Sequence, residues 1–225
     1  MSSRLTSVKA LAALSVVLAA VVIAAVLREY DGVQALDQAV LSYLDLRSPA
    51  IYYFSYTASL EAFAAVTAIA YFLDVGLHRS ASRRLVSFAV AIILSMIVTA
   101  LLKAYVMEPR PHEPLIYFGL LGNLVNADYY GFPSGHTVRV TVLAYYMMTT
   151  PSTRRKGLGY AASAYAIAIM VSRLLLQVHW LWDIVGGVVV GLWSCSLVDG
   201  VGERAWVYIY NRTFGLARPL RLRPN

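Results

Sequence analysis

Three short polar clusters interrupt an otherwise apolar chain, and each holds side chains that could bind or transfer a phosphate group. They occupy residues 103–111, 133–136 and 172–183. Cationic side chains, hydroxyls and N–H groups complement phosphate oxygens, and a pair of histidines matches the need for a nucleophile and a general acid. The three clusters together therefore predict a phosphoryl-transfer site.

The clusters supply donors of several kinds. Lys103, Arg110 and Arg173 provide cations, and the planar fork of arginine suits phosphate oxygens. Ser134 offers a hydroxyl, and Gly135 allows the backbone to approach an anion closely. A helix that begins here would add N–H groups and the positive end of its dipole. We expect these groups to hold the phosphoryl oxygens.

The two histidines of the clusters differ in their surroundings. His179 and Asp183 are four residues apart, so on a helical turn their side chains face each other. A carboxylate that bonds one ring nitrogen fixes the tautomer and leaves the other nitrogen free to attack. His136 then remains for acid catalysis.

These residues closely resemble the type 2 phosphatidic acid phosphatase superfamily of membrane lipid phosphatases. The family pattern is K-x6-RP, then PSGH, then SR-x5-H-x3-D, and the chain fills it without a gap between residues 103 and 183. Many fixed positions in order make the match far more specific than PSGH alone. The chain before residue 85 carries no motif and matches the family only in its helical plan.

The resemblance implies a role for each motif residue. His179 would be the nucleophile and form a phosphohistidine, Asp183 would orient it, and His136 would protonate the leaving oxygen. The phosphoryl oxygens would be held by Lys103, Arg110, Ser134, Gly135 and Arg173. The family implies no metal and no cofactor, and none is needed in principle because cations and N–H groups already complement the charge.

The composition places the chain in the membrane class. Of its 225 residues, 59% are hydrophobic and only 14% are charged, against about 25% charged in a soluble domain. We expect a single domain over residues 1–225 with a motif-bearing core at 85–200. The net charge of +7 lies in short clusters between apolar runs, which indicates membrane topology rather than nucleic-acid binding. One cysteine, Cys195, excludes an intrachain disulfide and a cysteine-rich metal site.

Apolar runs long enough to cross a bilayer predict the fold. A spanning helix needs about 20 residues, and only helices and closed barrels satisfy the backbone in lipid. The predicted spans are 10–27, 51–73, 85–102, 134–150, 157–176 and 183–198. The first is too long for a signal peptide and is expected to be retained. The fold class is therefore all-α, an integral membrane bundle of six transmembrane helices. Gly187 and Gly191 predict close packing of the last helix.

The basic residues predict the orientation of the bundle. With a cytoplasmic N-terminus, 13 of the 19 lysines and arginines fall in cytoplasmic segments. This places both termini in the cytoplasm and all three polar clusters on the outer face of the cell membrane. Aromatic clusters at 52–56 and 206–210 fit interface belts on the outer and inner sides. The basic tail after Gly202 is expected to touch anionic headgroups.

Two charged residues lie inside predicted spans. Glu61 is about ten residues into the second span, where an unpaired carboxylate costs on the order of 2.5–3.5 kcal/mol. Arg139 is three residues beyond His136 on the same helix face. We expect Glu61 and Arg139 to pair beneath the phosphate site, or Arg139 to reach the second phosphate of a diphosphate substrate. Separate solvation of each in a wet cavity is the alternative.

The function indicated is removal of phosphate from a membrane lipid. Polyprenyl diphosphate fits best because it is released outside when glycans are transferred, and phosphatidic acid and phosphatidylglycerol phosphate follow closely. A lipid phosphotransferase would carry the same motifs. A transporter with intramembrane charges is an alternative of another class. The expected partners are the lipid substrate and membrane lipids, with no nucleic acid.

Overall fold

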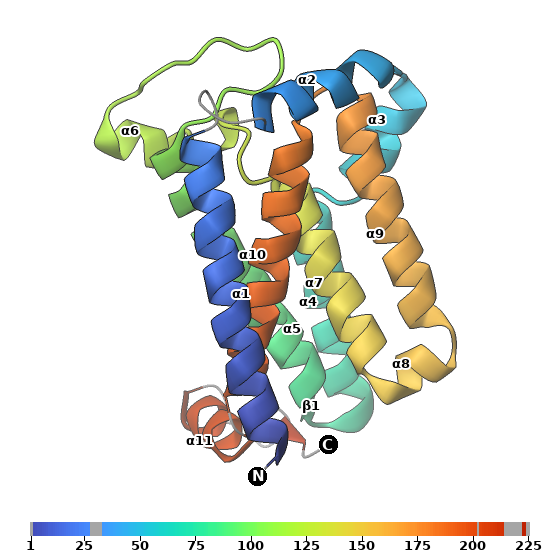
Figure 1. Ribbon diagram of the computed structural model, residues 1–225. Helices are drawn as coiled ribbons and strands as arrows, with labels where there is room; N and C mark the ends of the chain where they lie inside the picture. The colour runs from blue at the N-terminus through green and yellow to red at the C-terminus, as the bar shows by residue number, and fades with distance from the viewer. Residues whose placement is uncertain (1, 28–32, 202, 214–221, 224–225) are drawn as a thin grey trace.

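The computed structural model describes residues 2–27, 33–201, 203–213 and 222–223. Its elements, with the labels of Figure 1, are α1 (Ser2–Val26), α2 (Val33–Tyr43), α3 (Pro49–Tyr56), α4 (Leu60–His78), β1 (Ala81–Ser82), α5 (Arg83–Val106), α6 (Leu120–Val125), the 3-10 turn η2 (Ala127–Tyr129), α7 (Gly135–Thr149), α8 (Pro151–Arg155), α9 (Leu158–Leu175), α10 (Leu181–Gly200), α11 (Glu203–Thr213) and β2 (Leu222–Arg223).

Five of the described helices are long and apolar enough to cross a membrane. They are α1, α4, α5, α9 and α10, with the span in α1 covering Val8–Val26. The chain is therefore an all-α, multi-pass membrane protein with five candidate spans. The two short strands form a single parallel pair that joins Ala81 to Leu222.

Helix α7 is the centre of the bundle, although its 15 residues are too few for a candidate span. It packs against α5, α9 and α10, while α1 covers the other side of α10. Val138, Val140 and Val142 are fully buried. Because the phosphate-site motif opens this helix, its neighbours fix the position of the motif.

The contact between α10 and α7 depends on two glycines. A Cβ on Gly187 would lie 2.8 Å from the Cβ of Thr137, and a Cβ on Gly191 would lie 2.9 Å from the Cβ of Thr141. Any larger side chain would push the helices apart. The close packing predicted from the small-xxx-small spacing is confirmed.

The predicted second span is wrong in its boundaries. The structure breaks it into α3 and α4, and the Ser59 side chain caps α4 by accepting a hydrogen bond from the Ala62 N–H at 3.2 Å. Glu61 therefore lies exposed in the first helical turn instead of ten residues deep. A serine is a preferred N-cap and the helix dipole favours a carboxylate beside it, which explains why the helix begins here.

The two ends of the bundle are clearly distinct in Figure 1. Helices α2, α3 and α6 lie at one end, and α8, α11, β1 and the start of α1 lie at the other. The alternation of the long helices between these ends agrees with the predicted order of the spans. Residues 214–221 and 224–225 of the predicted basic tail lie outside the described residues.

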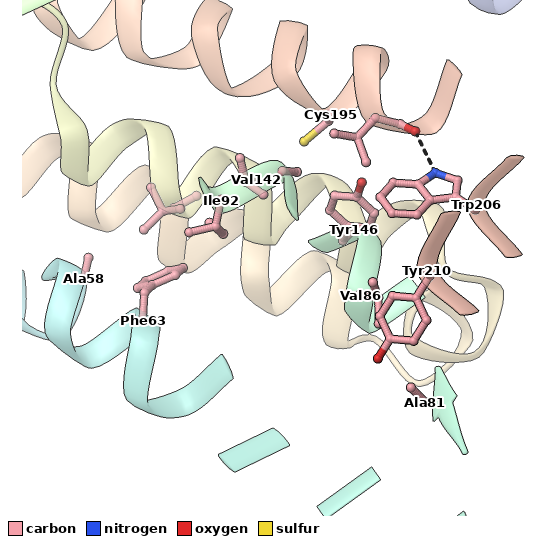
Figure 2. Close-up of a cluster of buried hydrophobic side chains, with 14 of the residues drawn as sticks. Ala58, Phe63, Ala81, Val86, Ile92, Val142, Tyr146, Cys195, Trp206 and Tyr210 are labelled. Atoms are coloured by element: carbon pink, nitrogen blue, oxygen red, sulfur yellow. Dashed lines mark hydrogen bonds between the residues drawn. The ribbon is translucent and has the colours of Figure 1, made fainter. Parts of the chain in front are cut away.

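Aromatic residues of α11 complete a buried cluster at its end of the bundle (Figure 2). Trp206 and Tyr210 are buried, and the Trp206 indole N–H donates to the Val198 carbonyl at 3.2 Å. These two rings pack into the core instead of forming the predicted interface belt, because α11 folds back onto the bundle; Tyr208 is exposed. Cys195 is fully buried in the same cluster.

Candidate active site

All three polar clusters come together at the end of the bundle that carries α2, α3 and α6. Lys103 lies in the last turn of α5, His136 in the first turn of α7 and Arg173 in the last turn of α9. A cavity of about 530 Å³ lies between them, and its walls include Lys103, Arg110, Gly135, His136, Arg173 and His179. Its volume is typical of ligand pockets. The predicted site residues thus share one cavity or, as with Ser134 and Asp183, lie buried beside its lining residues.

His179 and Asp183 form a buried pair. His179 lies in the short connection between α9 and α10, and its Nδ1 is 2.9 Å from Oδ2 of Asp183 in the first turn of α10. The same carboxylate oxygen accepts the backbone N–H of Trp180 at 3.0 Å. The carboxylate therefore fixes the ring through Nδ1, and Nε2 is left as the nitrogen available for attack.

The surroundings of His179 favour the neutral imidazole. Burial lowers the pKa of His179 well below its usual value, and the positive charges of Arg173, Arg110 and Lys103 lower it further. His179 is only 2% exposed, which accounts for the dominant effect of burial. A neutral ring has a lone pair on Nε2 and can act as a nucleophile.

The Lys103 ammonium holds the segment that precedes α7 and still has a donor for a ligand. Its Nζ donates hydrogen bonds to the carbonyls of Tyr130 and, at 3.3 Å, Gly131. These residues immediately precede the Pro133–His136 motif, so Lys103 fixes the approach of the chain to α7. An ammonium has three donors, which leaves one N–H for an anion in the cavity.

Each of the two motif arginines is held by a hydrogen bond that one terminal nitrogen of its guanidinium donates. Arg110 donates from Nη2 to the Asp128 carbonyl at 2.5 Å, and Arg173 donates from Nη1 to the Ser55 hydroxyl at 2.9 Å. Among the described residues, the buried Nε of each has no hydrogen-bond partner. Guanidinium groups with unpaired N–H donors beside a cavity are suited to bind an anion there.

The start of α7 offers further donors. Ser134 is the N-cap residue, and its buried hydroxyl has no hydrogen-bond partner within the described part of the chain. The N–H groups of the first turn have no acceptor within the helix. The Ser134 N–H is bonded to the Asp183 carbonyl at 3.0 Å, which connects the start of α7 to the start of α10.

Arg139 and Glu61 do not pair as predicted. Both line the cavity, but Arg139 donates from Nε to the Ala58 carbonyl at 2.8 Å and from Nη1 to the Met96 sulfur at 3.3 Å. Glu61 is exposed at the start of α4, where water can solvate it, so it does not need a buried partner. The predicted ion pair is therefore not formed in the structure.

Comparison with known proteins identifies the family. The sequence model of the PAP2 superfamily matches residues 84–202, which is more than half of the chain. The chain belongs to the PAP2 superfamily. The PAP2 match contains every residue of the three motifs, so the membership predicted from them is confirmed. Glu61 lies outside the matched range, as do α1 to α4.

The chain is similar to one curated relative and to one solved structure. Phosphatidylglycerophosphatase B of Bacillus subtilis (strain 168) is 32% identical over 88 residues, covering 36% of this chain and 43% of the relative. The match thus spans less than half of that relative. The crystal structure of a transmembrane PAP2 type phosphatidylglycerolphosphate phosphatase from Bacillus subtilis matches with a TM-score of 0.67 and 20% identity, over 86% of this chain and 96% of that one. The likeness shows that the two share a fold.

Several residues that hold the motif side chains in place are not themselves motif positions. Ser55 holds Arg173, and Trp180 holds both Asp183 and, through its indole N–H, the Pro109 carbonyl at 2.9 Å. Gly131 lies so close to Asp183 that a Cβ would be 2.8 Å from Oδ2. Gly131 lies two residues before Pro133 and Trp180 directly follows His179, so their closeness to the motifs was a usable signal. Ser55 is 118 residues from Arg173 in the chain, and no sequence signal connects them.

Proposed function

We propose that the chain is a membrane lipid phosphate phosphatase that acts through a phosphohistidine on His179. The observation that carries this proposal is the His179–Asp183 pair, 2.9 Å apart, at a cavity whose walls include Lys103, Arg110 and Arg173. A neutral histidine beside a phosphate-binding set of cations is the arrangement that nucleophilic phosphoryl transfer requires. Membership of the PAP2 superfamily supports the same conclusion.

The reaction has two steps. Nε2 of His179 attacks phosphorus, the bond from phosphorus to the lipid oxygen breaks, and His136 gives that oxygen a proton. Water then attacks the phosphohistidine, His136 takes the proton of the water, and the N–P bond breaks to release inorganic phosphate. The cations and the N–H groups of α7 stabilise the negative charge in both transition states. Asp183 stabilises the positive charge that develops on the ring.

The proposed orientation places this cavity on the outer face of the cell membrane. Helix α7 completes a plan of six membrane-crossing helices, with both termini in the cytoplasm. The excess of lysine and arginine in the segments at the α8 and α11 end supports this orientation. Arg154, Arg155 and Lys156 lie at that end, after α7.

We propose phosphatidylglycerol phosphate or polyprenyl diphosphate as the lipid. The activity named for the similar relative and for the similar solved structure supports phosphatidylglycerol phosphate. The outward-facing site supports the second, because that lipid is released outside. Both lipids place a transferable phosphate at the membrane surface, where the cavity would receive it.

The experiment is a phosphate-release panel on the purified full chain in detergent or vesicles. It compares phosphatidylglycerol phosphate, polyprenyl diphosphate, phosphatidic acid and a sphingoid phosphate, each with and without EDTA. We expect release from at least one lipid, unchanged by EDTA, and loss of release in His179→Ala. A second arm adds an acceptor lipid and looks for a phosphorylated product, which would indicate a phosphotransferase. Release that persists in His179→Ala would refute the proposed nucleophile.

A further inference from the structure

The cavity contains a cation that the three phosphate-binding motifs do not include. Arg139 lies on α7 one turn beyond His136 and is only 6% exposed. Its guanidinium lies against the first residue of α7, since a Cβ on Gly135 would be 3.3 Å from Nη1. Arg139 is therefore next to the helix start that would bind the transferred phosphate.

The guanidinium of Arg139 is only partly satisfied. Its one full-strength hydrogen bond runs from Nε to the Ala58 carbonyl at 2.8 Å. Nη1 meets the Met96 thioether, a weak acceptor, at 3.3 Å. Nη2 has no hydrogen-bond partner among the residues that the structure describes. A guanidinium on a cavity wall whose donors are not all paired is suited to bind an anion in that cavity.

Arg139 also stands between the phosphate cavity and an apolar groove. The groove, about 530 Å³, lies between α4 and α5 and is lined by apolar residues such as Ala68, Ile92 and Ile93. Leu60 and Met96 line both the groove and the cavity. Met96 is the residue that Arg139 touches, which places the guanidinium at the junction of the two spaces.

A bound lipid would place a particular chemical group at this junction. With its terminal phosphate among Lys103, Arg110 and Arg173, and its tail in the α4–α5 groove, the group beside Arg139 is the one that links phosphate to tail. That group is neutral in a monophosphate such as phosphatidic acid. It is a second phosphate in a polyprenyl diphosphate, and a phosphodiester in phosphatidylglycerol phosphate.

We propose that Arg139 binds the second phosphate group of the lipid substrate and thereby favours lipids with two phosphates over lipids with one. The proposal rests on the proposed function, since it names the substrate class of the same cavity. Two carboxylates also line the cavity: Asp128, which is 3.5 Å from Arg110, and Glu61, which is exposed. The four cations Lys103, Arg110, Arg139 and Arg173 outnumber them by two, so the cavity wall keeps an excess of positive charge for an anionic ligand.

The test compares matched lipids on wild type, Arg139→Gln and Arg139→Lys. One pair is polyprenyl diphosphate and polyprenyl monophosphate, and the other is phosphatidylglycerol phosphate and phosphatidic acid. A lost charged hydrogen bond corresponds to about a tenfold to hundredfold change. We expect kcat/KM of Arg139→Gln to fall by that factor on the two-phosphate lipids and by less than about threefold on the monophosphates. Arg139→Lys keeps the positive charge but lacks the planar guanidinium that can donate two parallel hydrogen bonds. We expect an intermediate loss of kcat/KM on the two-phosphate lipids.

Arg84→Gln is the matched control. Arg84 forms an ion pair with Asp199 at 3.0 Å near the other end of the bundle, so its loss lowers stability without reaching the cavity. We expect it to lower the melting temperature and leave the ratio between paired lipids unchanged. An equal fall on both members of each pair in Arg139→Gln, or no fall at all, would overturn the proposal. If wild type releases phosphate from none of the lipids, the proposed function itself fails.

Discussion

At the scale of single residues, the central feature is a carboxylate oxygen with several close neighbours. Oδ2 of Asp183 contacts Nδ1 of His179 and the N–H of Trp180, and Gly131 leaves just enough room for it. The Lys103 ammonium binds the Gly131 carbonyl and so holds this segment in place. The proposed nucleophile is thus positioned by residues from three parts of the chain.

Gly131→Ala tests whether this positioning matters for turnover. The new Cβ would lie 2.8 Å from Oδ2 of Asp183, and the oxygen cannot move without breaking its contacts with His179 or Trp180. Because a displacement of about 1 Å can cost roughly a hundredfold in rate, we expect kcat/KM to fall by at least about tenfold. Gly76→Ala on α4 has nothing within 4 Å and serves as the control. Wild-type activity in Gly131→Ala would contradict the account.

The protonation of His179 gives a prediction about pH. Burial and nearby cations lower its pKa, so we expect the ring to stay neutral to a lower pH than an ordinary histidine of pKa about 6.5. Histidine labelled with ¹⁵N reports the charge state by NMR, and His179→Gln identifies the signal. A His179 signal that titrates near pH 6.5 would show that the ring is not shielded as described.

At the scale of elements, α7 positions the site, and α10 holds α7 in place. The two helices can approach closely because α10 has glycines, without side chains, where it meets α7. A Cβ on Gly187 would meet Thr137 and, at 2.9 Å, the Ser134 carbonyl, which belongs to the N-cap of α7. One turn further on, a Cβ on Gly191 would meet Thr141 and the Val138 carbonyl at 3.1 Å. Both glycines affect packing, but only Gly187 contacts the start of the helix.

Alanine at each glycine separates these two effects. Overpacking a close interface costs about 1–3 kcal/mol, so Gly187→Ala and Gly191→Ala should both lower the melting temperature by comparable amounts. We expect kcat/KM to fall several-fold more in Gly187→Ala, because only that variant displaces the Ser134 backbone. If the two variants have equal melting temperatures and also lose equal activity, the contact between Gly187 and Ser134 does not fix the start of α7.

The sequence predicted some elements well and others poorly, for physical reasons. Long apolar runs bounded by charge predicted α5, α9 and α10 close to their observed ends, since lipid demands unbroken helices. In α1 they predicted the span Val8–Val26 but not the helical residues before it. The break at 57–59 was missed because Thr57, Ala58 and Ser59 interrupt hydrophobicity only weakly. The site motifs were found because each lies at the end of a helix, where its polar residues stand out against the apolar run. The partners of Arg139 were missed because Ala58 contributes only a backbone carbonyl.

At the scale of the whole molecule, access of a lipid to the cavity depends on which side of the membrane the cavity faces. The cavity lies at the α2, α3 and α6 end, and the basic segments lie at the opposite end. The positive-inside rule then predicts that the cavity faces outside. A site with that orientation would have access to lipid phosphates released on the outer face.

Cysteine labelling tests this orientation in intact cells. In a Cys195→Ser background, a membrane-impermeant thiol reagent should label a cysteine at His112 or Asn126, which are exposed at the cavity end. Cysteines at Ser80 or Ser152, at the other end, should label only after the cells are opened. The reverse pattern would place the cavity in the cytoplasm.

The most direct test of the central claim is to trap the phosphoenzyme. Purified protein is mixed with a lipid substrate labelled with ³²P in its terminal phosphate and quenched within one turnover in base, which preserves a phosphohistidine. We expect label on the peptide that contains His179, lost on brief treatment with acid because the N–P bond is labile. We expect no label in His179→Ala. Label that survives acid, or that remains in His179→Ala, would contradict the assignment of His179 as the nucleophile.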